Sequence, residues 1–224
     1  QRIVNEPDFT MHPRTFIFGA KAAPSYVYAK RIIELILAVA DVVNNDPRSA
    51  KFMKVVFIEN YGVSLAELII PAADVSEQIS TASKEASGTS NMKLMMNGAI
   101  TLGTMDGANV EIHDLVGEDN IVIFGLSSNE VLSYYANGTY SAWNEYNNSQ
   151  ILQNIMQSLF NGPLADSNRF QLIFDEIMNN NDCFFILKDL PEYIKAQERI
   201  EKLYQEKQRW AQMCIANIGS SGYF

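Results

Sequence analysis

The sequence predicts an α/β protein built on a doubly wound parallel sheet and followed by helices. Short β-branched and aromatic runs alternate with segments of helical periodicity, as expected for parallel strands joined by crossover helices. The run from Val55 to Ile58 lacks polar alternation, which is typical of a strand covered on both faces. With 224 residues, 47% of them hydrophobic, the chain can bury a genuine core in one large domain or two small ones.

The first elements follow a polar lead-in. Residues 1–14 contain two prolines and predict a loop. Residues 15–18 predict a short strand from their β-branched and aromatic side chains, and residues 24–43 predict a helix from their apolar spacing. That helix should end before Pro47, because the residue that precedes a proline avoids the α region.

The middle of the chain repeats this alternation. The expected elements are strands at residues 55–58, 74–79, 100–102 and 121–124, with short helices from Ser64 to Pro71 and from Met92 to Met96. At Asp106 and Gly107 the pattern allows either a hairpin turn or a short helix through Glu111 that Asp106 caps. Periodicity does not decide between them, and the helix is favoured.

The last part of the chain is predicted to be helical. Its apolar residues recur near helical spacing, and no internal repeat occurs. The expected helices span residues 129–136, 149–160, 167–178 and 191–215.

Charge and hydropathy exclude several partners. Seventeen basic and twenty-six acidic residues give a net charge of −9, so no basic stripe can neutralise a nucleic-acid backbone or an anionic bilayer. The longest apolar stretch, residues 32–40, is far shorter than the roughly 20 residues that span a bilayer. No secretion signal is recognisable. We therefore expect a cytoplasmic protein that binds neither nucleic acid nor membrane.

The cysteines and histidines of the sequence form none of the usual metal-binding or disulfide motifs. Cys183 and Cys214 are too few for a disulfide scaffold and have no zinc spacing. His12 and His113 stand in no metal motif, and no Gly-x-Ser-x-Gly nucleophile elbow occurs. The sequence therefore predicts no metal site.

The informative segment is Glu85–Lys93, which reads Glu-Ala-Ser-Gly-Thr-Ser-Asn-Met-Lys. Its small and hydroxyl residues lead into the predicted helix, so unpaired N–H groups and hydroxyls converge at the positive end of the helix dipole. Lys93 follows Thr89 and Ser90 by about one turn on the same face. An anion clamp and an amine at that separation suit a phosphorylated aldehyde bound as a Schiff base, as pyridoxal phosphate requires. An ordinary capped helix with an exposed lysine remains the alternative.

Extended to Asn97, this segment resembles the signature of the glycogen, starch and maltodextrin phosphorylases, in which the lysine carries pyridoxal phosphate. The flanking stretches that resemble the same family are residues 19–24, 59–61, 70–82 and 103–111, and the resemblance runs from about Pro13 to Phe224. It implies that residues 15–224 form most of the Rossmann-like C-terminal domain of a two-domain glycosyltransferase of the GT-B type. The N-terminal domain would then lie outside this chain, and the start at Gln1 rather than Met agrees with a piece of a longer protein.

The resemblance also implies roles for individual residues. Lys93 would carry the cofactor covalently, while the Thr89 hydroxyl and the amides of Thr89 and Ser90 would hold its 5′-phosphate. Tyr61 would line the cofactor pocket. Contacts to hydroxyls of the glucosyl unit are implied for Glu85, Ser87 and Gly88. Without the motif, Glu85 would be interpreted as a surface carboxylate and Tyr61 as a residue packed at the sheet edge.

Three positions depart from the family pattern. Ser90 stands where many members have glycine, a change that contacts through the amide can survive. Gly62 stands where some members have an arginine near the cofactor phosphate, and Leu68 stands where many have lysine. The basic segment that gives the family's phosphates a lysine and an arginine would lie upstream of Gln1.

The implied reaction is reversible phosphorolysis, in which an α-1,4-glucan and inorganic phosphate give glucose 1-phosphate and a chain one unit shorter. The cofactor's phosphate would donate and accept protons through the substrate phosphate, which requires strong local positive charge. The family implies a homodimer for the full-length enzyme. Because one wall of the cleft and the upstream cations are not encoded, we expect the isolated chain to fold but to be inactive.

Two alternatives stay open. A sugar-nucleotide-dependent glycosyltransferase of the same architecture would hold a nucleotide diphosphate at the same helix terminus, without pyridoxal phosphate. The chain could instead be a folded, catalytically silent domain. Lys93 and the length of the matching motif favour the phosphorylase.

Overall fold

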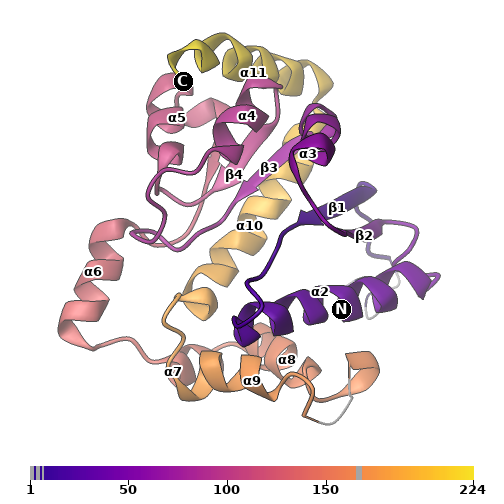
Figure 1. The fold of residues 1–224 in the computed structure, drawn as a ribbon, viewed down its shortest axis with the longest axis vertical. Helices are drawn as coiled ribbons and strands as arrows, with labels where there is room; N and C mark the ends of the chain where they lie inside the picture. The colour runs from indigo at the N-terminus through magenta and orange to yellow at the C-terminus, as the bar shows by residue number, and fades with distance from the viewer. Residues whose placement is uncertain (1–2, 4–5, 7, 165–167) are drawn as a thin grey trace. The chain divides into compact units, whose positions relative to one another are not determined.

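The computed structural model describes residues 3, 6, 8–164 and 168–224. The chain forms two compact units. Unit 1 comprises Gln1–Gly62 and Trp143–Asn181, and unit 2 comprises Val63–Ala142 and Asp182–Phe224. Each unit contains a parallel sheet and its own helices (Figure 1).

Unit 1 is organised around a two-stranded parallel sheet. Strand β1 (Arg14–Gly19) pairs with β2 (Met53–Ile58), and the crossover helix α2 (Val27–Asn45) packs on β2. Asn44 ties the end of α2 to the sheet, because its side-chain amide exchanges hydrogen bonds of 2.8 and 2.9 Å with the backbone of Val55. The later helices are α7 (Ala142–Asn147), α8 (Gln150–Ser158), η3 (Gly162–Leu164), α9 (Gln171–Phe174) and η4 (Asp175–Asn179).

Unit 2 contains a three-stranded parallel sheet in which β4 lies between β3 and β5. Strands and crossover helices alternate along the chain: β3 (Val75–Gln78), α4 (Ser90–Met96), β4 (Ile100–Gly103), α5 (Ala108–Val116) and β5 (Val122–Ile123). The remaining elements are α3 (Val63–Ile69), η1 (Ile70–Ala72), η2 (Glu118–Asn120), α6 (Ser128–Asn137), α10 (Ile186–Gln205), α11 (Lys207–Ser220) and η5 (Ser221–Tyr223).

Helices cover both faces of the unit 2 sheet. One buried cluster joins the strands to α10 and α11 and includes Ile100, Leu102, Val122, Ile200 and Met213. A second joins the sheet to α4 and α5 and includes Met95, Ile112 and Ile121. Because successive strand residues point to opposite faces, the two clusters lie on opposite sides of the sheet. Helix α11 also contacts α4 and α5, beside which it runs in Figure 1.

The predicted α/β class with parallel strands is confirmed, and the β-α-β-α-β order of unit 2 is Rossmann-like. The parallel strands form two ladders, because β1 pairs with β2 in unit 1 and β3 to β5 pair in unit 2. Val55 of β2 is buried and Val56, Phe57 and Ile58 are half-buried, so the expectation of a strand covered on both faces is met only in part. An apolar run indicates burial, but it does not report how many layers pack on a strand.

The long helix expected at residues 191–215 is two helices. The chain leaves helical geometry at Glu206, with φ −82° and ψ 75°, and α10 begins before Pro191, which lies inside it. Apolar periodicity missed the break because α10 and α11 both pack on the same sheet face, as the contacts of Ile200 and Met213 show. No glycine or proline marks the break in the sequence.

Two further differences concern the helices of unit 1. Ser167, the expected start of a helix, lies outside the described residues, and the rest of that segment forms α9 followed by the π-helical turn η4. Helix α7 was not predicted. In the described part of the chain, no helix has both the length and the apolar character needed to cross a membrane.

Candidate functional site

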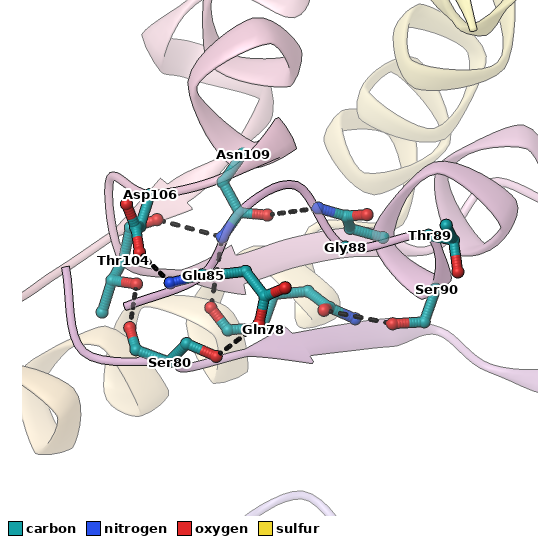
Figure 2. A pocket seen from close by; sticks show the side chains of 10 residues that line it. Gln78, Ser80, Glu85, Gly88, Thr89, Ser90, Thr104, Asp106 and Asn109 are labelled. Atoms are coloured by element: carbon teal, nitrogen blue, oxygen red, sulfur yellow. Dashed lines mark hydrogen bonds between the residues drawn. The ribbon is translucent and has the colours of Figure 1, made fainter. Parts of the chain in front are cut away.

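A polar pocket lies at the carboxyl ends of β3 and β4 in unit 2, where they meet the starts of α4 and α5 (Figure 2). Ligands of parallel α/β sheets bind at this edge. The pocket volume is about 190 Å³, below the roughly 300–1,000 Å³ of typical ligand sites. Its lining residues are Gln78, Ser80, Glu85, Gly88, Thr89, Ser90, Asn91, Thr104, Asp106 and Asn109.

Asn109 organises the floor of this pocket from the first turn of α5. Its side chain is 3% exposed, and its Nδ2 donates to the carbonyl oxygens of Gln78 at 3.2 Å and Thr104 at 3.0 Å. Its Oδ1 accepts from Nδ2 of Asn91 at 3.1 Å, so three dashed lines meet at Asn109 in Figure 2. One side chain thereby links the ends of both strands to the start of α4.

Gly103 permits this close arrangement. A Cβ atom at Gly103 would lie 2.5 Å from the carbonyl oxygen of Gln78 and 2.7 Å from Nδ2 of Asn109, so only glycine fits here. The next residue, the buried Thr104, donates from Oγ1 to the carbonyl oxygen of Ser80 at 2.5 Å. The polar floor therefore extends the pairing of β3 and β4 beyond their ladder.

Glu85 lies on an exposed loop above this floor. Its backbone N–H and that of Lys84 donate to Oδ2 of Asp106 at 2.7 and 3.0 Å. Its own Oε2 accepts a 3.1 Å hydrogen bond from the Ser80 hydroxyl. Farther along the loop, the Ser87 carbonyl accepts from the backbone N–H of Ala108 at 2.7 Å. Both the backbone and the carboxylate of Glu85 are thus held.

The anion-binding terminus predicted from the sequence is the start of α4. The helix begins at Ser90, two residues before the expected Met92. Thr89 is the N-cap residue, but its side chain makes no capping hydrogen bond, and the preceding Gly88 has φ +79°. The Ser90 hydroxyl donates to Oε1 of Gln78 at 3.2 Å. The Thr89 and Ser90 hydroxyls therefore border the pocket beside the first amides of the helix.

Lys93 occupies the predicted place one turn into α4. Its backbone N–H donates to the Thr89 carbonyl at 3.2 Å, and its side chain is exposed. The pocket brings together four of the predicted site residues, Glu85, Gly88, Thr89 and Ser90. Lys93 and Ser87 lie beside it along the same segment without lining it.

Tyr61 belongs to unit 1, whereas the pocket belongs to unit 2. A Cβ atom at Gly19 would lie 2.7 Å from the Tyr61 ring, so this ring packs against the backbone at the end of β1. That contact agrees with the packing interpretation of Tyr61, and the cofactor role stays a prediction. Two of the positions that depart from the family pattern lie elsewhere: Gly62 also belongs to unit 1, and Leu68 is 72% exposed on α3.

Sequence reasoning assigned Asp106 the wrong local role. The expected helix exists as α5, but its N-cap residue is Gly107, with φ +52° and no side-chain cap. The Asp106 carboxylate instead accepts hydrogen bonds from the two loop amides described above. The pocket residues that were not singled out are Gln78, Ser80, Asn91, Thr104 and Asn109. Polar residues directly after β3 and β4 were the available signal.

Contacts made by Thr81 and Lys84 hold the loop to the rest of unit 2. The Thr81 hydroxyl donates to the Phe184 carbonyl at 2.7 Å, and the Lys84 ammonium lies 4.7 Å from the centre of the Tyr135 ring. Tyr135 in turn donates to the Cys183 carbonyl at 2.6 Å. The loop that carries Glu85 thus has a packed base as well as polar anchors.

Two buried carboxylates of unit 2 accept hydrogen bonds from backbone amides. Oδ2 of Asp182 accepts from the Tyr140 hydroxyl at 2.9 Å and the Leu187 amide at 2.8 Å, and burial raises the pKa of Asp182. Oδ1 of Asp189 accepts from the Leu126 amide at 2.9 Å, and burial raises the pKa of Asp189 to about 6. Both carboxyl groups are held in the protein interior by backbone donors.

Comparisons with known proteins agree with the sequence motif. A family model described as carbohydrate phosphorylase matches residues 1–224. The chain is 53% identical to a glycogen phosphorylase of Bacillus subtilis, 48% to the muscle form of glycogen phosphorylase from Rattus norvegicus and 44% to a glycogen phosphorylase of Synechocystis. These alignments cover 100% of this chain and 28%, 26% and 26% of the respective relatives. The chain therefore spans about a quarter of their length.

Proposed function

We propose, because the chain belongs to the carbohydrate phosphorylase family, that it is the pyridoxal-phosphate-binding part of an α-1,4-glucan phosphorylase. The complete enzyme would transfer terminal glucosyl units to inorganic phosphate and release glucose 1-phosphate. One observation carries this proposal: Glu85, Thr89 and Ser90 converge on one pocket at the carboxyl edge of the sheet, one helical turn before Lys93.

The donor set at the start of α4 suits a phosphate monoester. The Thr89 hydroxyl makes no capping bond, and the first backbone amides of a helix are natural phosphate donors. In this proposal Thr89 and Ser90 hold the 5′-phosphate, and the exposed Lys93 amine binds the cofactor covalently. When bound, the cofactor supplies a phosphate group that exchanges a proton with the substrate phosphate.

The other side of the pocket suits a sugar. Glu85 presents a carboxylate whose Oε2 is already oriented by Ser80, and the loop through Gly88 borders the same cavity. We assign Glu85, Ser87 and Gly88 to the hydroxyls of the glucosyl unit. A carboxylate acceptor of this kind binds a sugar hydroxyl without taking part in proton transfer.

Positive charge must come from other parts of the enzyme. Among the described residues, those that line the pocket include two carboxylates, those of Glu85 and Asp106, and neither lysine nor arginine. Two phosphate groups in contact need strong positive compensation. We therefore propose that residues 15–224 form most of the C-terminal, Rossmann-like domain of a GT-B glycosyltransferase. The complete enzyme would be a homodimer, and the chain alone would be inactive.

Reductive labelling tests the proposal. Borohydride reduction of the purified complete enzyme should leave the pyridoxyl mass on the peptide that contains Met92-Lys93-Leu94. Lys93→Ala should remove the label, whereas the control Lys84→Ala should retain it, because the Lys84 ammonium lies against Tyr135. Label found only on other peptides would overturn the assignment. An unlabelled enzyme that transfers glucose from a nucleotide diphosphate sugar would identify the alternative glycosyltransferase.

A further inference from the structure

We infer that Asp106 is a positioning residue that fixes the loop bearing Glu85, and thereby places the Glu85 carboxylate for sugar binding. The inference rests on the proposed function, since it adds a residue to the same site. Asp106 does not need to touch the sugar in this role. It acts through the backbone of Lys84 and Glu85.

The contact that carries the inference joins residues far apart in sequence. A single carboxylate oxygen of Asp106, Oδ2, accepts from the N–H of Glu85 at 2.7 Å and from the N–H of Lys84 at 3.0 Å. Both donors lie outside any helix or strand, so the sheet does not hold them. Hydrogen bonds to a carboxylate are shorter and stronger than those to neutral acceptors. The Lys84 N–H is shared with the Thr81 carbonyl at 3.0 Å, so the shorter bond from Glu85 is the main contact by which Asp106 anchors this end of the loop.

The loop has a second anchor on the same turn. Ala108 donates its N–H to the Ser87 carbonyl at 2.7 Å. A Cβ atom at Gly107 would lie only 2.5 Å from that carbonyl oxygen, so loop and turn are in close contact. Both ends of the segment 84–87 are thus hydrogen-bonded to the turn 106–108. Between these two anchors, the Glu85 carboxylate accepts a hydrogen bond from Ser80.

Asp106 starts from a rigid base. Its backbone N–H donates to the Thr104 carbonyl at 2.9 Å, and its carbonyl accepts from the Asn109 N–H at 3.2 Å. Thr104 and Asn109 are 1% and 3% exposed and are tied to the end of β3. The turn therefore transmits the position of the sheet edge to Glu85. Groups that bind a transition state must be held within a few tenths of an ångström, so this connection matters for catalysis.

A double-mutant cycle in the complete enzyme tests the inference. Asp106→Ala should lower kcat/KM for phosphorolysis roughly 10–100-fold while the pyridoxal phosphate content stays unchanged. In the Glu85→Gln background the same substitution should lower kcat/KM less than about threefold, because the group that it positions is already altered. Asp106→Asn, which keeps an acceptor oxygen, should recover most of the loss.

Amide hydrogen exchange supplies a readout that does not depend on turnover. Asp106→Ala should accelerate exchange in a peptide covering residues 82–88. The matched control is Glu130→Ala in α6, which also removes a carboxylate that accepts a backbone amide, that of Ser127 at 2.9 Å. This control should leave both kcat/KM and the exchange of residues 82–88 unchanged.

Two results would overturn the inference: equal losses in both backgrounds, or unchanged exchange at residues 82–88. If Asp106→Ala does not accumulate as folded enzyme, the cycle is run with Asp106→Asn, whose smaller loss must likewise vanish in the Glu85→Gln background. Failure of the proposed function would look different. The wild-type enzyme would then lack cofactor and phosphorolysis, while the exchange measurement would still test the anchor.

Discussion

Asn91 and Asn109 hydrogen-bond through their side-chain amides at 3.1 Å and join the first turns of the two crossover helices beneath the pocket. Both are buried, with exposures of 2% and 3%. Because Asn109 also donates to the ends of β3 and β4, the pocket floor is one continuous hydrogen-bonded unit. Its stability can be separated experimentally from ligand binding.

Replacing Asn109 should destabilise this floor. Asn109→Ala removes one donor from each of the Gln78 and Thr104 carbonyls and the acceptor of the buried Asn91 amide, and we expect the free energy of unfolding of the complete enzyme to fall by about 1–3 kcal/mol. Urea denaturation measures the loss. The control Asn137→Ala removes an exposed 3.1 Å bond to Ser133 and should change the free energy by no more than about 0.5 kcal/mol. Equal losses in the two variants would contradict the role of Asn109.

Glu85→Gln should affect sugar binding without affecting the cofactor. A hydrogen bond to a charged group contributes about 1.5–3 kcal/mol, so kcat/KM should fall by about one to two orders of magnitude. The acidic limb of the pH–rate profile should remain, because Glu85 transfers no proton in this proposal. The control Glu77→Gln alters a carboxylate on β3 that accepts a hydrogen bond from the Tyr193 hydroxyl, and it should keep the wild-type kcat/KM. A full wild-type rate in Glu85→Gln, or loss of the limb, would show a different role.

Alanine substitutions at Gly107 and Gly117 provide a matched test of the close contact between the loop 84–87 and the turn 106–108. Both have positive φ, +52° and +77°, so alanine should introduce backbone strain of about 1–3 kcal/mol at either position. Only at Gly107 would the new Cβ meet an atom, the Ser87 carbonyl oxygen at 2.5 Å, whereas nothing lies within 4 Å at Gly117. Gly107→Ala should therefore lower both the melting temperature and kcat/KM, and Gly117→Ala only the melting temperature. Full activity in Gly107→Ala would contradict the contact.

Ionisation of Asp189 should lower the free energy of unfolding as the pH rises from about 4 to 6. Burial raises its folded pKa from 3.8 to about 6 against the lowering effect of the Leu126 amide, and the nearby carboxylates of Glu192, Asp182 and Glu130 raise it further. Between pH 3.8 and 6 the unfolded chain loses this proton first, so ionisation favours unfolding, and the full penalty is present above pH 6. Asp189→Asn should therefore raise the melting temperature more at pH 7.5 than at pH 5. A larger gain at pH 5 would contradict the sign.

Local sequence features were enough to identify the segment Glu85–Lys93. A helix start, its preceding small residues and a lysine one turn later are separated by a few residues, so their geometry follows from short-range backbone rules. The strand–helix alternation was equally accessible, because the periodicities of 2 and 3.6 are written into consecutive positions. The family resemblance rests on the same contiguous residues, which is why the comparisons agree with it.

The tertiary structure decided what consecutive residues cannot encode. Asp106 caps no helix but holds an amide 21 residues away, and Asn109 joins two strands to a second helix. The break at Glu206 was likewise not evident from the sequence, because both helices continue the same apolar face across it. These outcomes depend on which polar groups meet once the sheet has formed. The sequence thus determined the elements and the motif, whereas long-range hydrogen bonding and shared burial determined how the pocket is held together.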